Sequence, residues 1–93
     1  MITIEALEEL LFREEEVRVI FRAPKSMLVS LWPYKNNIGD DKNLSILTDR
    51  IHATYSELPF VIVDGRGITQ FRTGIKIGVL RNTYVNNAVP AIT

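Results

Sequence analysis

The chain has no cysteine and only one histidine among its 93 residues. Without cysteine, disulfide bridges, thiolate metal sites and cysteine nucleophiles are excluded together. A conventional catalytic triad or a metal site built on the single histidine would need further partners that no motif supplies. Small secreted domains often depend on disulfides, so we expect a cytoplasmic protein that is not an enzyme and binds no cofactor or metal.

Long apolar runs and an excess of charge of either sign are also missing. No run approaches the roughly 18–20 residues that cross a bilayer, so we expect no contact with a membrane. Residues 1–5 lack the basic and then apolar layout of a signal peptide. The 11 basic and 11 acidic residues cancel, whereas proteins that bind nucleic acid usually carry a clear positive excess.

What is present is typical of one soluble domain spanning residues 1–93. The chain is 46% hydrophobic and 24% charged, which argues against disorder, and it is too short to bury two cores. The last residues, 86–93, show no periodicity, so we expect a tail that is either frayed or packed against a neighbour. The acidic triplet 14–16 follows the first helical pattern and is interpreted as a solvated connector.

Two segments show helical spacing and five favour strands. Apolar residues at helical spacing predict helices over 4–13 and 44–58, the second with Leu44, Leu47, Ile51, Tyr55 and Leu58 on one stripe. Alternation and branched residues predict a first hairpin from 17–22 and 27–32. Three further strands, near 60–64, 68–72 and 75–85, would be joined by glycine turns at 64–67 and 73–74.

This order predicts an α+β fold. A helix with a continuous apolar stripe must bury it, and one face of a sheet is the natural surface. We therefore expect a two-layer sandwich in which two helices cover a mainly antiparallel, five-stranded sheet, in the order αββαβββ. The sequence leaves open which sheet face the first helix covers.

Two motifs invite a chemical interpretation. His52 follows the apolar stripe of the second helix and could act as a general base, although its position favours a half-exposed structural residue. The segment 64–67, Asp-Gly-Arg-Gly, has glycines like a phosphate-binding loop. A strand rather than a helix follows it, so we interpret it as a hairpin turn with an exposed arginine.

The leading hypothesis is a small non-catalytic binding or regulatory module that acts through homodimerisation or a protein partner. Both faces of the expected sheet carry apolar side chains, whereas one helical layer covers only one face. Arginine beside an aromatic anchor is typical of the centre of an interface. The residues expected to bind the partner are Arg18, Ile20, Arg22, Trp32, Arg66 and Arg72.

The alternative is a nucleic-acid-binding protein. A sheet face that combines cations with aromatic rings can hold a phosphate backbone while bases stack on the rings. The residues that would serve this function are Arg22, Tyr34, Arg72, Lys76, Arg81 and Tyr84.

Overall fold

The computed structural model describes residues 1–88, with side chains described for 1–85. Within these residues the chain forms three helices and four short strands. In chain order they are β1 (Ile2–Thr3), α1 (Ile4–Glu14), β2 (Arg18–Phe21), β3 (Leu28–Val29), α2 (Leu44–Thr54), β4 (Phe60–Val63) and α3 (Ile77–Ala88). Of the expected tail 86–93, the first three residues complete α3, and 89–93 lie outside the described residues.

The strands form two separate antiparallel pairs. β1 pairs with β3, and β2 pairs with β4 with Val19 opposite Ile62 and Phe21 opposite Phe60. A single bridge between Val63 and Thr69 extends the second pair beyond the turn 64–67. The α+β class and the antiparallel pairing are therefore as expected.

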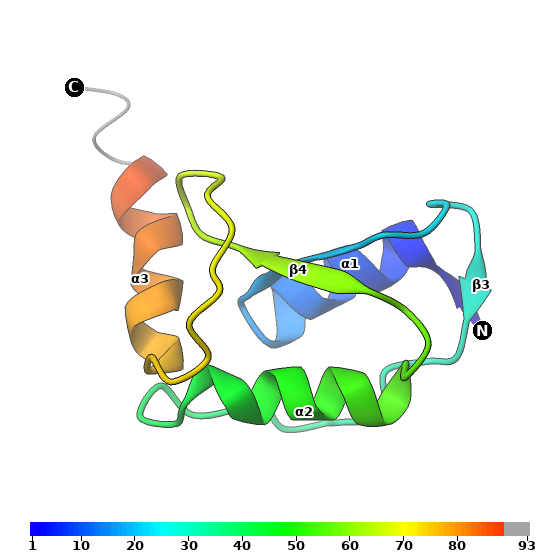
Figure 1. Cartoon of the computed structure of the whole chain (residues 1–93), viewed down its shortest axis with the longest axis horizontal. Helices are drawn as coiled ribbons and strands as arrows, with labels where there is room; N and C mark the ends of the chain where they lie inside the picture. Colours follow the sequence, from blue (N-terminus) through cyan, green and yellow to red (C-terminus); the bar gives the residue numbers. More distant parts are fainter. Residues whose placement is uncertain (89–93) are drawn as a thin grey trace.

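The core lies between the helices and the β2–β4 pair. Figure 1 shows α2 beneath β4 and α1 behind it, with α3 standing at one end. The helix predicted over 44–58 ends at Thr54, four residues early. Its apolar stripe is buried from the first turn to Tyr55, which is 5% exposed, whereas Leu58 is half-buried. The fully buried side chains of the two long helical stripes are Ile4, Leu7, Leu11, Leu44, Leu47 and Ile51.

The expected five-stranded sheet and the count of two helices require correction. In the described part of the chain β2 pairs with β4 rather than with β3, so the first hairpin does not form. Residues 68–72 contribute only the bridge at Thr69 instead of a full strand. The third expected strand of the meander, 75–85, is replaced from Ile77 onward by α3.

The helical form of this last segment has a physical reason. Residues 77, 80, 81 and 84 follow the spacing i, i+3, i+4, i+7 that places side chains on one helical face. Ile77 and Leu80 are fully buried on that face. The other two are Arg81, whose side chain is 10% exposed, and half-buried Tyr84, so a search for aliphatic residues alone finds only half of this face.

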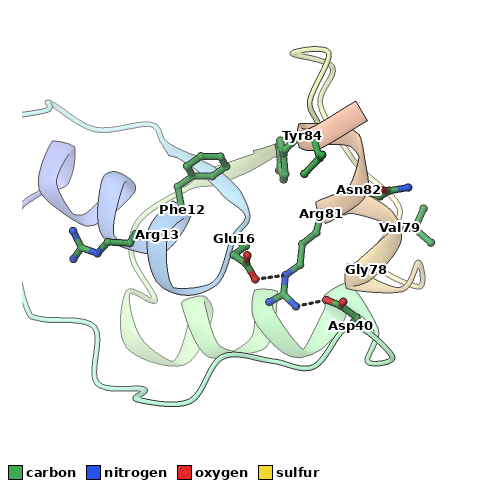
Figure 2. A pocket seen from close by; sticks show the side chains of 10 residues that line it. Phe12, Arg13, Glu16, Asp40, Gly78, Val79, Arg81, Asn82 and Tyr84 are labelled. Atoms are coloured by element: carbon green, nitrogen blue, oxygen red, sulfur yellow. Dashed lines mark hydrogen bonds and ion pairs between the residues drawn. The ribbon is translucent and has the colours of Figure 1, made fainter. Parts of the chain in front are cut away.

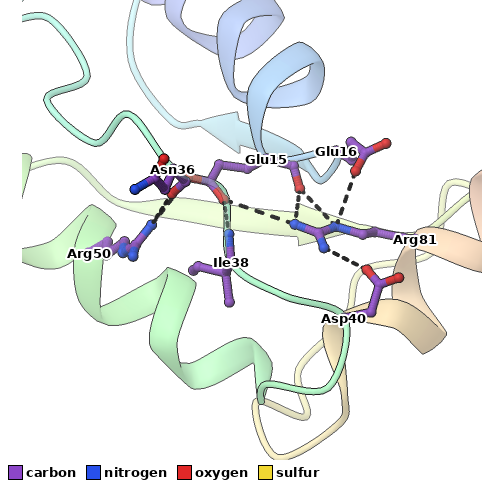
Figure 3. A network of polar contacts seen from close by, with 7 residues as sticks. All are labelled: Glu15, Glu16, Asn36, Ile38, Asp40, Arg50 and Arg81. Atoms are coloured by element: carbon purple, nitrogen blue, oxygen red, sulfur yellow. Dashed lines mark hydrogen bonds and ion pairs between the residues drawn. The ribbon is translucent and has the colours of Figure 1, made fainter.

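A polar network fixes α3 to the end of α1 (Figure 3). The Arg81 guanidinium donates to the Glu15 carbonyl at 3.0 and 2.7 Å and to the Asp40 carboxylate at 2.7 Å. The Glu15 carboxylate accepts the Ile38 N–H at 3.1 Å and pairs with Arg50 at 3.4 Å. Glu15 was expected in a solvated connector, but it is 1% exposed. Because a buried carboxylate is costly unless it is paired, these contacts define where the loop and the helices meet.

The turn at 64–67 approaches the α3 backbone closely. Gly65 donates its N–H to the Thr83 hydroxyl at 2.8 Å. A Cβ atom built on Gly65 would lie 2.0 Å from the Thr83 carbonyl oxygen and 2.8 Å from the Tyr84 Cα. Both neighbours are backbone atoms, so only glycine fits without moving the helix or the turn.

Gly65→Ala should therefore destabilise the fold by about 1–3 kcal/mol, the range typical of an overpacked site. The measurement is the free energy of unfolding in urea. Gly74→Ala is the matched control, because a Cβ there meets no atom within 4 Å. Equal unfolding midpoints for the two variants would contradict the close approach of the turn to α3.

Candidate functional site

Three adjoining hollows meet at Phe12 on α1. They have volumes of about 660, 310 and 240 Å³, and Phe12 lines all three. The first lies between α1 and α3, the second beside the turn 64–67, and the third between α1 and β2. Figure 2 shows the first hollow, with Phe12 and Tyr84 at one side and Arg81 between Glu16 and Asp40 at the other. Phe12 is 38% exposed, so an aromatic ring is accessible where the hollows join.

Two contacts hold the Phe12 ring in place. Its edge meets the Tyr84 ring at 5.4 Å between centroids and 89° between planes. The Arg18 guanidinium lies over its face at 4.8 Å from the centroid. Edge-to-face packing and a cation–π contact both orient the ring, so the aromatic and cationic groups form one unit.

The Tyr84 hydroxyl joins this unit to the sheet. It accepts the Arg18 backbone N–H at 2.9 Å and donates to the Val63 carbonyl. Arg18 and Val63 are opposite each other at the end of the β2–β4 ladder, so the hydroxyl bridges the two strands there. Burial raises the pKa of Tyr84, while the hydrogen bond from Arg18 acts in the opposite direction. The hydroxyl therefore stays protonated and able to donate well above neutral pH.

Apolar side chains continue from Phe12 in two directions. On α3, Val79 and Val85 are 61% and 64% exposed and line the first hollow. On β2, half-buried Ile20 lines the third hollow. We call this region the Phe12 surface and define it by Phe12, Arg18, Ile20, Val79, Tyr84 and Val85.

The sequence prediction found only part of this surface. Arg18 and Ile20 were expected on one face of the first strand, and they lie together on the outer face of β2. Arg22 follows on the same alternation and is exposed. Phe12 was missed. It directly follows Leu11, which belongs to the buried stripe, so its aromatic ring must lie off that stripe, and this was a signal that could have found it.

Trp32 lies in the core and is only 8% exposed, so the expectation that it anchors a partner is corrected. Its ring packs against Tyr34 at 4.8 Å and Tyr55 at 6.3 Å between centroids. The Tyr55 hydroxyl donates to the Ser30 carbonyl at 2.9 Å, and burial raises the pKa of Tyr55 to about 12. The indole Nε1 is buried without a hydrogen-bond partner among the described residues, which is a local cost that packing must offset.

The remaining predicted residues are spread over the molecule. Arg66 pairs with Asp64 at 3.3 Å, and Arg72 is exposed beyond the turn. Tyr34 packs on Trp32, and Lys76 precedes α3. Arg81 is held within the polar network with a side chain 10% exposed. Arg22 directly follows β2 and Tyr84 lies on α3, so the six residues of the nucleic-acid alternative come from several different segments.

The two motifs with possible chemistry have structural roles. The His52 ring packs on Phe60 at 5.0 Å between centroids, and the residue is exposed. In the turn 64–67, Asp64 Oδ1 accepts the N–H groups of Arg66 and Ile68 at 2.9 and 3.0 Å. The hydrogen bond from the Ile68 backbone is the main reason that the pKa of Asp64 is lowered.

Comparisons with protein-family models, with curated proteins and with solved structures give no match. Within residues 1–88, no group of three or more acidic, histidine or cysteine side chains is placed to hold a metal ion. None of the helices described here combines the length and the apolar character needed to cross a bilayer. The Phe12 surface is therefore interpreted from its own geometry.

Tyr84→Phe should lower the free energy of unfolding by about 1–2 kcal/mol, because it removes the hydroxyl that serves two backbone groups. The measurement is chemical unfolding near neutral pH. Tyr34→Phe is the matched control, since the Tyr34 hydroxyl makes no hydrogen bond to the described residues, and it should change stability by less than about 0.5 kcal/mol. A Tyr84 variant as stable as this control would show that the bridge contributes nothing.

Proposed function

We propose that the chain is a small non-catalytic binding module that docks onto a second copy of itself through the Phe12 surface. The observation that carries this proposal is the composition of that surface. An accessible phenylalanine, a tyrosine and an arginine contact one another at its centre, and aromatic residues and arginine are enriched at the centres of protein interfaces.

The apolar part of the surface supports the same proposal. Val79 and Val85 leave most of their side chains in water, and they continue the surface along α3. Scattered exposed apolar residues are ordinary, but exposed apolar residues that line one preformed hollow, as Val79 and Val85 do, are typical of an interaction site. Burial against a partner would remove this area from water at roughly 25 cal/mol per Å² of apolar surface.

The charges beside the surface favour a second copy over a strongly acidic or basic partner. Glu5 and Glu9 on α1 and Arg18 and Arg22 near β2 make no ion pair with the described residues. Two acids and two bases side by side are complementary to the same arrangement rotated by a two-fold axis. The net charge of zero agrees with self-association better than with binding to a polyanion.

The test is the molar mass of the protein in solution. It is measured at concentrations from about 1 to 100 µM, where a dimer of moderate affinity changes from mostly monomeric to mostly dimeric. Phe12→Glu should weaken the dimer by at least about 30-fold in Kd, the loss of a central interface residue. Ile46→Glu is the matched control, because Ile46 on α2 is also 38% exposed and lies outside the Phe12 surface. It should dimerise like the wild type.

Circular dichroism should confirm that both variants fold, and Val85→Glu provides a second disruption at the other end of the surface. A wild-type protein that stays monomeric at the highest concentration overturns the proposal. Equal loss of the dimer in Phe12→Glu and Ile46→Glu does so as well. A labelled oligonucleotide that binds with a steep salt dependence and is lost in Arg22→Ala would instead support the nucleic-acid alternative.

A further inference from the structure

Two short rows of charged side chains that form no ion pair with the described residues adjoin the Phe12 surface, and Arg18 belongs to both the surface and one of the rows. Glu5 and Glu9 form the acidic row on α1, and Arg18 and Arg22 form the basic row along β2. Both glutamates share the third hollow with Arg18. Glu8, the third glutamate at this hollow, already has partners within the chain. Its carboxylate accepts the Phe21 N–H and pairs with Lys25, both at 2.7 Å.

The two rows run in opposite chain directions. α1 leads through a short turn into β2, and Phe12 contacts Arg18 near that turn. At the other end the Glu5 N–H donates to the Lys25 carbonyl at 3.1 Å. Glu9 therefore lies at the same end as Arg18, and Glu5 lies at the same end as Arg22.

We infer that two copies recognise each other by laying the acidic row of α1 on the basic row of the partner's β2. This inference rests on the proposed function, and it names how the same surface selects its partner. A two-fold axis that runs along the hollow between α1 and β2 places the acidic row of each copy on the basic row of the other. Because the axis is parallel to the rows, the end with Glu9 and Arg18 in one copy meets the same end of the other copy. Glu9 then faces the partner's Arg18, and Glu5 faces the partner's Arg22.

The chemistry of these groups suits such pairing. A guanidinium binds a carboxylate through two parallel hydrogen bonds, so these pairs set geometry as well as attraction. Charge pairs across an interface mainly determine orientation and the choice of partner. The Phe12 surface would supply the burial, and the four pairs of the dimer would fix its register.

The test reverses one row at a time. The variant R18E/R22E has two acidic rows and E5R/E9R has two basic rows, so each should fail to dimerise with itself at concentrations where the wild type is dimeric. A 1:1 mixture should form a heterodimer, because every acidic row then meets a basic row. Native mass spectrometry separates the heterodimer from either homodimer.

Controls with the same change of charge keep the test specific. K42E/K76E and D49R/E57R change four exposed residues outside the rows, and they should dimerise within about threefold of the wild-type Kd, since distant exposed charges interact weakly through screening. The wild-type Kd should rise by about tenfold or more from 50 to 500 mM NaCl, since exposed charge pairs are screened. This second measurement needs no variant to fold.

The outcomes separate the two proposals. If the wild-type dimer Kd does not change with salt and both R18E/R22E and E5R/E9R still form homodimers, the pairing of rows is overturned. The proposed function is not affected by that result. A monomeric wild type overturns both. Loss of the homodimers together with a heterodimer in the mixture supports the inference.

Discussion

The contact between Arg81 and the end of α1 determines the arrangement of the whole surface. Among its described side chains, α3 buries two apolar ones completely, Ile77 and Leu80, so their hydrophobic burial contributes a limited part of the stability that holds the helix in place. The guanidinium reaches the Glu15 carbonyl and the Asp40 carboxylate, and so ties α3 to two other parts of the chain. Because the Arg81 side chain is only 10% exposed, its guanidinium must keep these partners, although the Asp40 carboxylate itself is 74% exposed. The position of Tyr84 against Phe12 follows from it.

The sequence predicts the parts of the fold that depend on apolar periodicity. The stripe from Leu44 to Tyr55 is buried as expected, because a helix and its burial follow from the same spacing. The final segment differs because half of its inward face consists of Arg81 and half-buried Tyr84, whose polar ends need hydrogen-bond partners. Arg81 and Tyr84 look like surface residues in a sequence, and only the tertiary structure supplies the carbonyl groups that accept their hydrogen bonds.

The same limit explains which site residues could be predicted. Alternation along a strand placed Arg18 and Ile20 on one face, and this depends only on the local backbone. Trp32 belongs to no regular element, so its burial depends on how the long segment between β3 and α2 crosses the core. Phe12 can be recognised as a site residue only from the folded structure, in which α3 and β2 bring Tyr84 and Arg18 to its ring. No spacing in the sequence predicts these long-range contacts.

The arginines of the polar network and Arg18 of the Phe12 surface are held in different ways. Arg50 and Arg81 are paired in the interior network, where losing one partner would leave a buried charge uncompensated. Arg18 is anchored differently, because its backbone is held by Tyr84 while its guanidinium rests on Phe12 and forms no ion pair with the part of the chain that the structure describes. A cation that is held in position but not neutralised keeps its capacity to bind an anion, at little further cost in conformational entropy. This preorganisation is the reason that the proposed interface relies on Arg18 rather than on the more buried arginines.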